Sequence, residues 1–112
     1  RLRQEELGLV DALEVERSVF TPNGDGINDI FAVAYNLLKL TRPTPVFFQI
    51  YDLGGRLVVE GSSEDRHGRF VRLWRGIDAA GKMVAPGVYI YQIKVEADAG
   101  TESRQGVVQV AY

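Results

Sequence analysis

The sequence has 112 residues, enough for one domain with a hydrophobic core of its own. Its 13 basic and 15 acidic residues leave a net charge of −2, which argues against a basic nucleic-acid-binding surface. It contains no cysteine, so disulfide frameworks, thiolate zinc sites and cysteine nucleophiles are excluded.

The chain opens with a polar stretch that gives way to a β pattern. Residues 1–12 carry scattered leucines, and Gly8 interrupts the helix-forming residues, so we interpret the stretch as a linker or assembly arm. Residues 13–112 are interpreted as the folded domain. From Leu13 apolar and charged residues alternate with a period of two, which predicts a strand. Residues 21–29 are dense in Pro, Asn, Gly and Asp, which predicts a loop.

The middle of the chain predicts further strands, two of them in a hairpin. Residues 30–40 are apolar, rich in aromatic and β-branched side chains and bounded by turn signals, which favours a strand. Segments 46–52 and 56–60 flank a Leu-Gly-Gly turn, and glycine supplies the positive φ that a tight hairpin needs. We expect a polar turn over 61–69 and a short strand over 70–74.

The last third of the chain predicts a long loop and a second hairpin. The loop covers 75–87 and is rich in Gly and Pro. The strand 88–97 places apolar residues on one face and Gln, Lys and Glu on the other. A turn at 98–100 leads to a final strand over 103–112. About seven short strands at regular spacing predict a β-sandwich or barrel. Its core is expected to include Phe48, Ile50, Trp74, Tyr89, Tyr91 and Ile93.

Two motifs resemble known bacterial families. Residues 20–29, FTPNGDGIND, resemble the opening of C-terminal domains on cell-surface and gliding-related proteins, many of them cargo of type IX secretion. Residues 50–58, IYDLGGRLV, and 73–93, LWRGIDAAGKMVAPGVYIYQI, are similar to the immunoglobulin-like domain of the flagellar hook-capping protein. The resemblance covers 13–112 and implies an all-β, immunoglobulin-like antiparallel sandwich.

The resemblance implies a non-catalytic structural or interaction module, carried by a secreted or cell-surface bacterial protein or built into an extracellular assembly. Its expected partners are other domains or subunits of such an assembly. The residues agree, because His67 has no Cys, Asp or second His at metal or triad spacing. Glu64 and Asp65 are adjacent and would point to opposite faces of a strand. We expect no enzyme activity, nucleic-acid partner or membrane insertion.

The segment from Trp74 to Tyr89 is predicted to carry structural residues. Trp74 is large enough to fill the space between two sheets, and Tyr89 begins the apolar face of the following strand. Asp78 can accept hydrogen bonds from nearby main-chain amides. Gly81 and Gly87 permit backbone angles that other residues resist.

The loop over 21–29 is the candidate ligand site. Oxygen-bearing side chains at alternate positions followed by glycine resemble the start of a calcium loop, with Asn23, Asp25 and Asp29 as candidate ligands. Ala32 stands where a bidentate glutamate would complete such a loop. We favour the alternative, a tight turn in which the same side chains bond loop amides. No other cofactor is expected.

A carbohydrate-binding module is the alternative function, from a different class. It requires flat aromatic rings exposed on one face. Phe47, Tyr51 and Tyr35 would provide them if they lie on the outer face, opposite Phe48 and Ile50.

Overall fold

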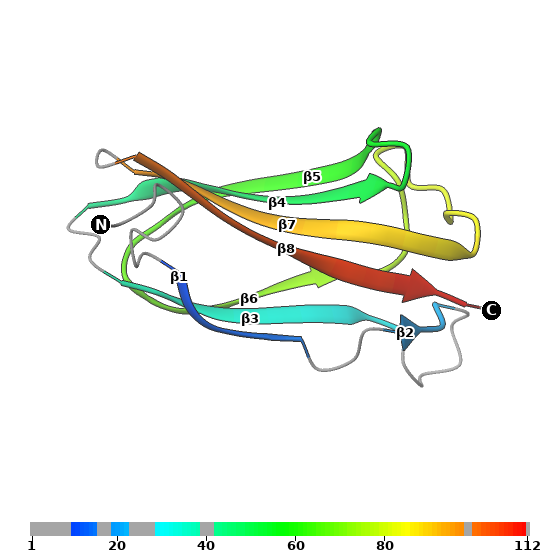
Figure 1. Ribbon diagram of the computed structural model, residues 1–112, viewed down its shortest axis with the longest axis horizontal. Helices are drawn as coiled ribbons and strands as arrows, with labels where there is room; N and C mark the ends of the chain where they lie inside the picture. Colours follow the sequence, from blue (N-terminus) through cyan, green and yellow to red (C-terminus); the bar gives the residue numbers. More distant parts are fainter. Residues whose placement is uncertain (1–9, 16–18, 23–28, 39–41, 98–99, 112) are drawn as a thin grey trace.

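A computed structural model describes residues 10–15, 19–22, 29–38, 42–97 and 100–111, which form two packed β-sheets (Figure 1). One sheet has the strand order β1-β3-β6 and the other β2-β8-β7-β4-β5. The pairings within these sheets are antiparallel, apart from the parallel pair of β2 with β8. The strands are β1 (Val10–Val15), β2 (Val19–Phe20), β3 (Phe31–Leu37), β4 (Thr44–Asp52), β5 (Leu57–Asp65), β6 (Gly68–Trp74), β7 (Gly87–Ala97) and β8 (Gly100–Val110).

This architecture confirms the all-β, immunoglobulin-like sandwich, with eight strands in the described residues where about seven were expected. Two boundaries differ from the sequence analysis. β1 begins at Val10, inside the stretch interpreted as a linker or arm, whose residues 1–9 lie outside the described part of the chain. β5 runs through residues 61–65, which were expected to be a turn, because it pairs with β4 as far as the partners Thr44 and Asp65.

The core lies between the sheets and follows the period of two. Along β3 every second residue is buried, beginning at Phe31 and ending at Leu37, and β7 repeats the alternation from Tyr89 to Val95. A strand in a sandwich points alternate side chains into the core, so the pattern fixes which face is buried. The six predicted core residues are all buried, as expected: Phe48, Ile50, Trp74, Tyr89, Tyr91 and Ile93.

A group of aromatic rings packs one end of this core. The ring of Trp74 lies 5.4 Å from that of Phe20 and 5.5 Å from that of Tyr89, between ring centroids. Phe31 lies 6.1 Å from Phe20 and 5.4 Å from Tyr91. Tilted and edge-on ring pairs at these distances add to the stabilisation from burial. Side chains of both sheets therefore interlock at this end.

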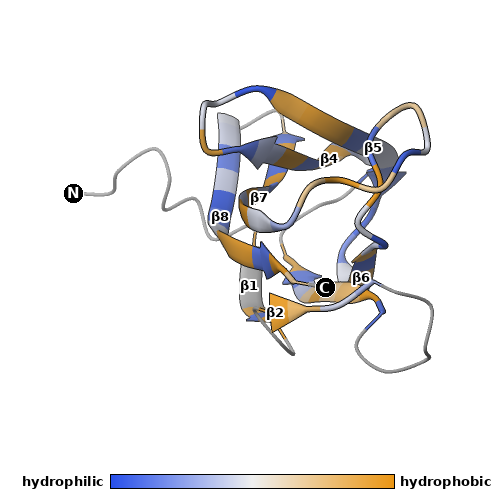
Figure 2. Cartoon of the chain, turned by 90° about the vertical axis from the view of Figure 1, so that its right-hand side faces the viewer, coloured by the Kyte–Doolittle hydropathy of each residue, from blue (hydrophilic) through white to orange (hydrophobic). Residues whose placement is uncertain are grey.

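The two long sides of the sandwich are built differently. Figure 2 shows β1 and β8 on one side and β5 and β6 on the other, in agreement with the strand orders. On neither side does a hydrogen-bonded ladder between described strands join the two sheets, so side chains close the core there. The part of the chain that the structure describes holds no helix with the length and hydropathy of a membrane span.

Candidate functional site

The connection between β6 and β7 is held by its own hydrogen bonds. The indole Nε1 of Trp74 donates to the carbonyl oxygen of Ile77 at 2.8 Å, so the buried ring has no unsatisfied donor. Ile77 forms a bridge with Met83, and the Val84 amide donates to the Gly76 carbonyl at 2.9 Å. These bonds turn the segment back on itself and place it beside Trp74.

Asp78 organises the tip of this connection. Its Oδ1 accepts hydrogen bonds from the amides of Ala80 at 2.9 Å and Lys82 at 3.0 Å. The Lys82 amide, with smaller contributions from the amides of Ala80 and Gly81, lowers the pKa of the Asp78 carboxyl below its usual range. Because the folded pKa is lowered, the carboxylate supports the loop at neutral pH and loses that effect as pH falls through the lowered pKa.

The remaining residues predicted to be structural lie around the same loop. Gly81 has φ +83° and Gly87 has φ +153°, a region that side chains rarely adopt. The Tyr89 hydroxyl donates to the Ala85 carbonyl oxygen at 2.7 Å. Trp74, Asp78, Gly81 and Tyr89 therefore all make hydrogen bonds within this connection, and Gly87 begins β7 at its end.

An open groove of about 500 Å³ runs between this loop and the β4–β5 turn. Its two carboxylates are bonded to their own turns: Asp78 as above, and Asp52 through the Arg56 amide at 2.9 Å and an ion pair with the Arg56 guanidinium at 3.4 Å. Both carboxylates therefore hold their own turns in place. The groove is therefore lined by residues that hold the loop and the β4–β5 turn in place.

The predicted calcium loop falls largely outside the described residues. Asn23 and Asp25 are in the part that is not described, and Asp29 lies partly exposed just before β3. Among the described residues no group of three or more His, Asp or Glu side chains is placed to hold a metal ion. Calcium binding by Asn23, Asp25 and Asp29 stays a prediction.

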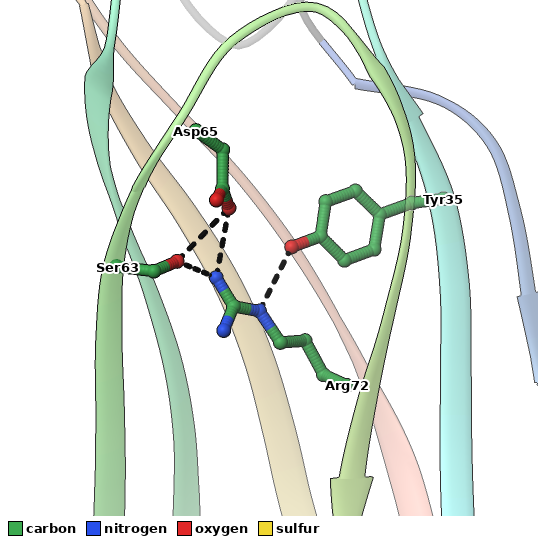
Figure 3. Close-up of polar contacts among 4 residues, drawn as sticks. All are labelled: Tyr35, Ser63, Asp65 and Arg72. Atoms are coloured by element: carbon green, nitrogen blue, oxygen red, sulfur yellow. Dashed lines mark hydrogen bonds and ion pairs between the residues drawn. The ribbon is translucent and has the colours of Figure 1, made fainter.

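A polar cluster closes the side of the sandwich between β5 and β6 (Figure 3). The guanidinium of Arg72 donates from Nε to the Tyr35 hydroxyl at 3.1 Å and from Nη2 to Asp65 at 2.9 Å and to the Ser63 hydroxyl. Ser63 in turn donates to the Asp65 carboxylate at 2.9 Å. Arg72 and Tyr35 come from one sheet, and Ser63 and Asp65 from the other, so the cluster joins the sheets where the backbone does not.

The electrostatics of this cluster are set by burial. Burial raises the pKa of the Tyr35 phenol above its usual value of 10.0, although the hydrogen bond from Arg72 acts in the opposite direction. The side chains of Arg72 and Asp65 keep exposed fractions of 20% and 13%. The sequence analysis missed this cluster because Ser63 and Asp65 were assigned to a turn, and no local pattern shows that Arg72 points inward.

A second cluster closes the opposite side, between β1 and β8. The carboxylate of Glu102 is completely buried; its Oε2 accepts from the Val10 amide at 3.0 Å and lies 3.1 Å from Arg104 Nη2. The same Arg104 nitrogen donates to the Val10 carbonyl oxygen at 3.4 Å. Glu102 and Arg104 therefore hold both backbone groups of the first residue of β1.

The aromatic face required for carbohydrate binding is not present as predicted. Tyr35 is fully buried, because it lies on the inward face of β3 and its hydroxyl belongs to the Arg72 cluster. Phe47 and Tyr51 lie on β4 and are partly exposed. The prediction for Tyr35 is wrong, and the three rings do not share an outer face.

The outer face of the three-stranded sheet is apolar. Val71 and Leu73 on β6 have exposed fractions of 56% and 52%, and they pair across the ladder with Ala34 and Ala32 on β3. Arg69 limits the strip at one end, where it pairs with Glu14 at 3.0 Å and with the Asn36 side chain at 3.2 Å. Exposed valine and leucine side by side on one face are typical of surfaces that contact other proteins.

Comparison with known proteins gives the family and the fold class. The family model described as the CHU_C type IX secretion signal domain matches residues 13–110. FlgD from P. aeruginosa shares 24% identity and a TM-score of 0.58, over 72% of this chain and 61% of its own. FlgD from Xanthomonas campestris, described in connection with hook capping in flagellar assembly, shares 23% and 0.52, over 72% and 55%.

PorU from Porphyromonas gingivalis, solved as a latent dimer, shares 17% identity and a TM-score of 0.68, over 91% of this chain and 9% of its own. The chain therefore spans less than two thirds of each of these three proteins. At these identities the likeness shows a common fold. Among curated proteins no match to the chain was found.

The sandwich defines an immunoglobulin-like module, and the clusters in its described residues are structural. Because the family model matches almost the whole domain, the chain belongs to the CHU_C type IX secretion signal domain family. This confirms the resemblance seen in the sequence. The domain is secretion-associated, and its family indicates a secreted protein destined for the cell surface or the extracellular space. The carbohydrate-binding alternative finds no support.

Proposed function

We propose that this domain is the accessory or C-terminal module by which a secreted bacterial protein is recognised for type IX export and joined to a surface assembly. The observation that carries the proposal is the family match over residues 13–110, which spans the sandwich from β1 to β8. Most of the large hydrophobic residues within the matched segment are buried in the core. A receptor would therefore contact the surface of the folded domain and not an extended hydrophobic sequence. Recognition then depends on the folded state.

The hydrogen bonding of the domain supports this role. The loop around Asp78 and the clusters around Arg72 and Glu102 bond their polar groups to one another. Because these polar groups bond within the domain, they stabilise the fold. Contact with a partner would then be made by the outer faces of the sheets. The partners are proteins of the secretion machinery or neighbouring subunits at the cell surface.

Export of a reporter tests the proposal. Residues 1–112 are fused behind a periplasmic reporter and expressed in a bacterium with type IX secretion and in a strain that lacks the route. We expect reporter at the surface or in the medium only where the route is intact. Release from both strains alike, or retention in both, would contradict the proposal.

Two variants separate the folded surface from the bare sequence. Trp74→Ala opens the aromatic end and is expected to abolish export, because it costs about 3–5 kcal/mol of stability. Leu53→Ser changes an apolar residue of the β4–β5 turn whose side chain is 68% exposed, and should leave export unchanged. Circular dichroism of the purified domains shows which variant keeps the fold.

A further inference from the structure

The inference concerns the free edge of β6. This strand ends the three-stranded sheet and, in the described part of the chain, pairs only with β3. Its outer edge therefore presents a row of backbone N–H and C=O groups that another strand could pair with. With residues 68–74 the edge is long enough for such pairing.

The side chains of β6 alternate in a way that suits an added strand. Arg69, Val71 and Leu73 point to the outer face, and Arg75 follows in the same alternation just beyond the strand. The order on this face is basic, apolar, apolar, basic. A strand added beside β6 would place every second side chain next to this row.

The adjacent surface extends the apolar part of that row. Ala32 lies opposite Leu73 and Ala34 opposite Val71. The alanine side chains on β3 are short, so the longer side chains on β6 project beyond them. A shallow depression of about 350 Å³ lies along this face. Its lining consists of Glu14, Val15, Ala32, Ala34, Arg69 and Val71. Because the depression lies over β3, between β1 and β6, a strand added beyond β6 would bury its apolar side chains against Val71 and Leu73 and not in the depression.

The charges around β6 select the chemistry of the partner. Arg72 is matched by the largely buried Asp65. Arg69 pairs with Glu14, but the two side chains are 50% and 69% exposed, so this pair is weak and Arg69 can also face a partner carboxylate. Arg66 and Arg75 are exposed and form no ion pair with another described residue. The edge is therefore basic although the whole chain has a net charge of −2. A second β6 would be repelled by this row, whereas an acidic segment would be attracted.

The other sheet edges lack this combination. β5, the free edge of the larger sheet, is acidic and polar over its second half; its Glu60 accepts a 2.6 Å hydrogen bond from Gln49 of β4. β8 is covered by β2 at Val110, and Glu102 holds the first residue of β1 beside it. Among the described strands, β6 is the one that combines an unpaired edge with two exposed apolar side chains on one face.

We propose that an extended acidic segment of a partner protein adds to β6 as a further strand of this sheet. Carboxylates at its two ends face Arg69 and Arg75, and two apolar residues between them cover Val71 and Leu73. This proposal names a class of partner for the proposed function. It rests on that function in one respect, that the domain acts by contacting other proteins. Export is measured in cells and strand addition on the purified domain, so either can fail alone.

A peptide with this pattern tests strand addition. The probe is the blocked heptapeptide Glu-Thr-Val-Thr-Ile-Thr-Glu, whose carboxylates are spaced like Arg69 and Arg75. It is titrated into ¹⁵N-labelled domain at low ionic strength while amide shifts are followed by NMR. We expect shifts confined to β6 and the facing residues of β3, and weaker binding as salt is raised. The charge-reversed peptide with lysine at both ends should not bind.

Matched variants decide between the β6 edge and any other surface. Leu73→Glu should weaken peptide binding about tenfold by removing apolar contact and adding a repelling charge. Leu53→Glu, the same change on an exposed leucine of the β4–β5 turn, should leave it unchanged. Shifts on β5 or β8, equal binding of the lysine peptide, equal loss in both variants, or no shifts with millimolar peptide would each overturn the proposal.

Discussion

The two long sides of the sandwich are closed by the same chemistry with different results. Between β1 and β8, the fully buried Glu102 bonds the Val10 amide and Arg104. Between β5 and β6, Arg72 bonds Asp65, and both side chains keep some exposure. The first side fixes the start of a strand, whereas the second joins side chains and leaves the edges of both strands uncovered. A sandwich can therefore close its core with side chains and still leave strand edges unpaired.

Loss of the Glu102 carboxylate should have the largest effect. Glu102→Ala leaves the buried Val10 amide without its acceptor and Arg104 without its counter-charge. We expect a loss of about 2–4 kcal/mol, below the range for fully buried pairs because Arg104 stays partly solvated. Urea unfolding followed by circular dichroism measures it. Glu102→Gln, which keeps an acceptor for Val10, should lose clearly less; equal losses would show that the hydrogen bond is unimportant.

Removal of the Arg72 guanidinium should have a smaller effect on the opposite side. Arg72→Met keeps much of the apolar stem but leaves Asp65 without its ion pair. The expected loss is about 1–3 kcal/mol, because Asp65 retains some contact with water. In the same unfolding assay, adding Asp65→Asn to Arg72→Met should recover part of the loss. A double variant as unstable as the sum of the two single variants would contradict coupling.

Tyr35→Phe removes the hydroxyl that accepts from Arg72 Nε and should cost about 1 kcal/mol at neutral pH. Burial raises the folded-state pKa of Tyr35, so its contribution is full below pH 10.0 and is lost as pH rises through the raised pKa. The stability difference between wild type and variant should therefore shrink above pH 10.0. Burial also raises the pKa of Tyr91, so the variant keeps some alkaline sensitivity. A difference that stays constant through this range would contradict the assignment.

Changes on the open face should have the smallest effect on stability. Val71→Thr and Leu73→Gln alter exposed side chains on which no other described strand packs, and we expect shifts within about 0.5 kcal/mol. Measuring the free energy of unfolding of these variants and of Glu102→Ala in one series would compare the two sides directly. A loss above about 2 kcal/mol at either position would mean that this face is covered in the isolated domain.

The strands with one buried face could be predicted from the sequence. Alternation along β7 identified core residues such as Tyr91 and Ile93, because a sandwich buries every second side chain. The segment of β3 was predicted as a strand from its apolar content, but its buried face was not, since Tyr35 was placed on the outside. The loop around Asp78 was also foreseen, since aspartate and glycine at turn spacing have a local mechanism. Signals of this kind lie within a few residues of one another.

Features that depend on distant partners could not be predicted in this way. The second half of β5 turns polar residues, Ser63 and Asp65, toward the core side and has no apolar face, so its sequence resembles a polar turn. Glu102 and Val10 are 92 residues apart and carry no shared pattern. Gly106 lies opposite Tyr91 across the β7–β8 ladder, and a Cβ there would stand 2.5 Å from the tyrosine hydroxyl. Only the three-dimensional register shows why this position needs glycine.

Amide hydrogen exchange on the isolated domain tests most directly that Glu102 holds the backbone at the start of β1, whereas the outer edge of β6 is unpaired. The account predicts slow exchange at the Val10 amide, which is bonded to buried Glu102, and fast exchange at the β6 amides that do not face β3. NMR resolves both sets in one experiment at neutral pH. A Val10 amide that exchanges as fast as the outer edge of β6, or protection along that edge equal to that of β7, would contradict it.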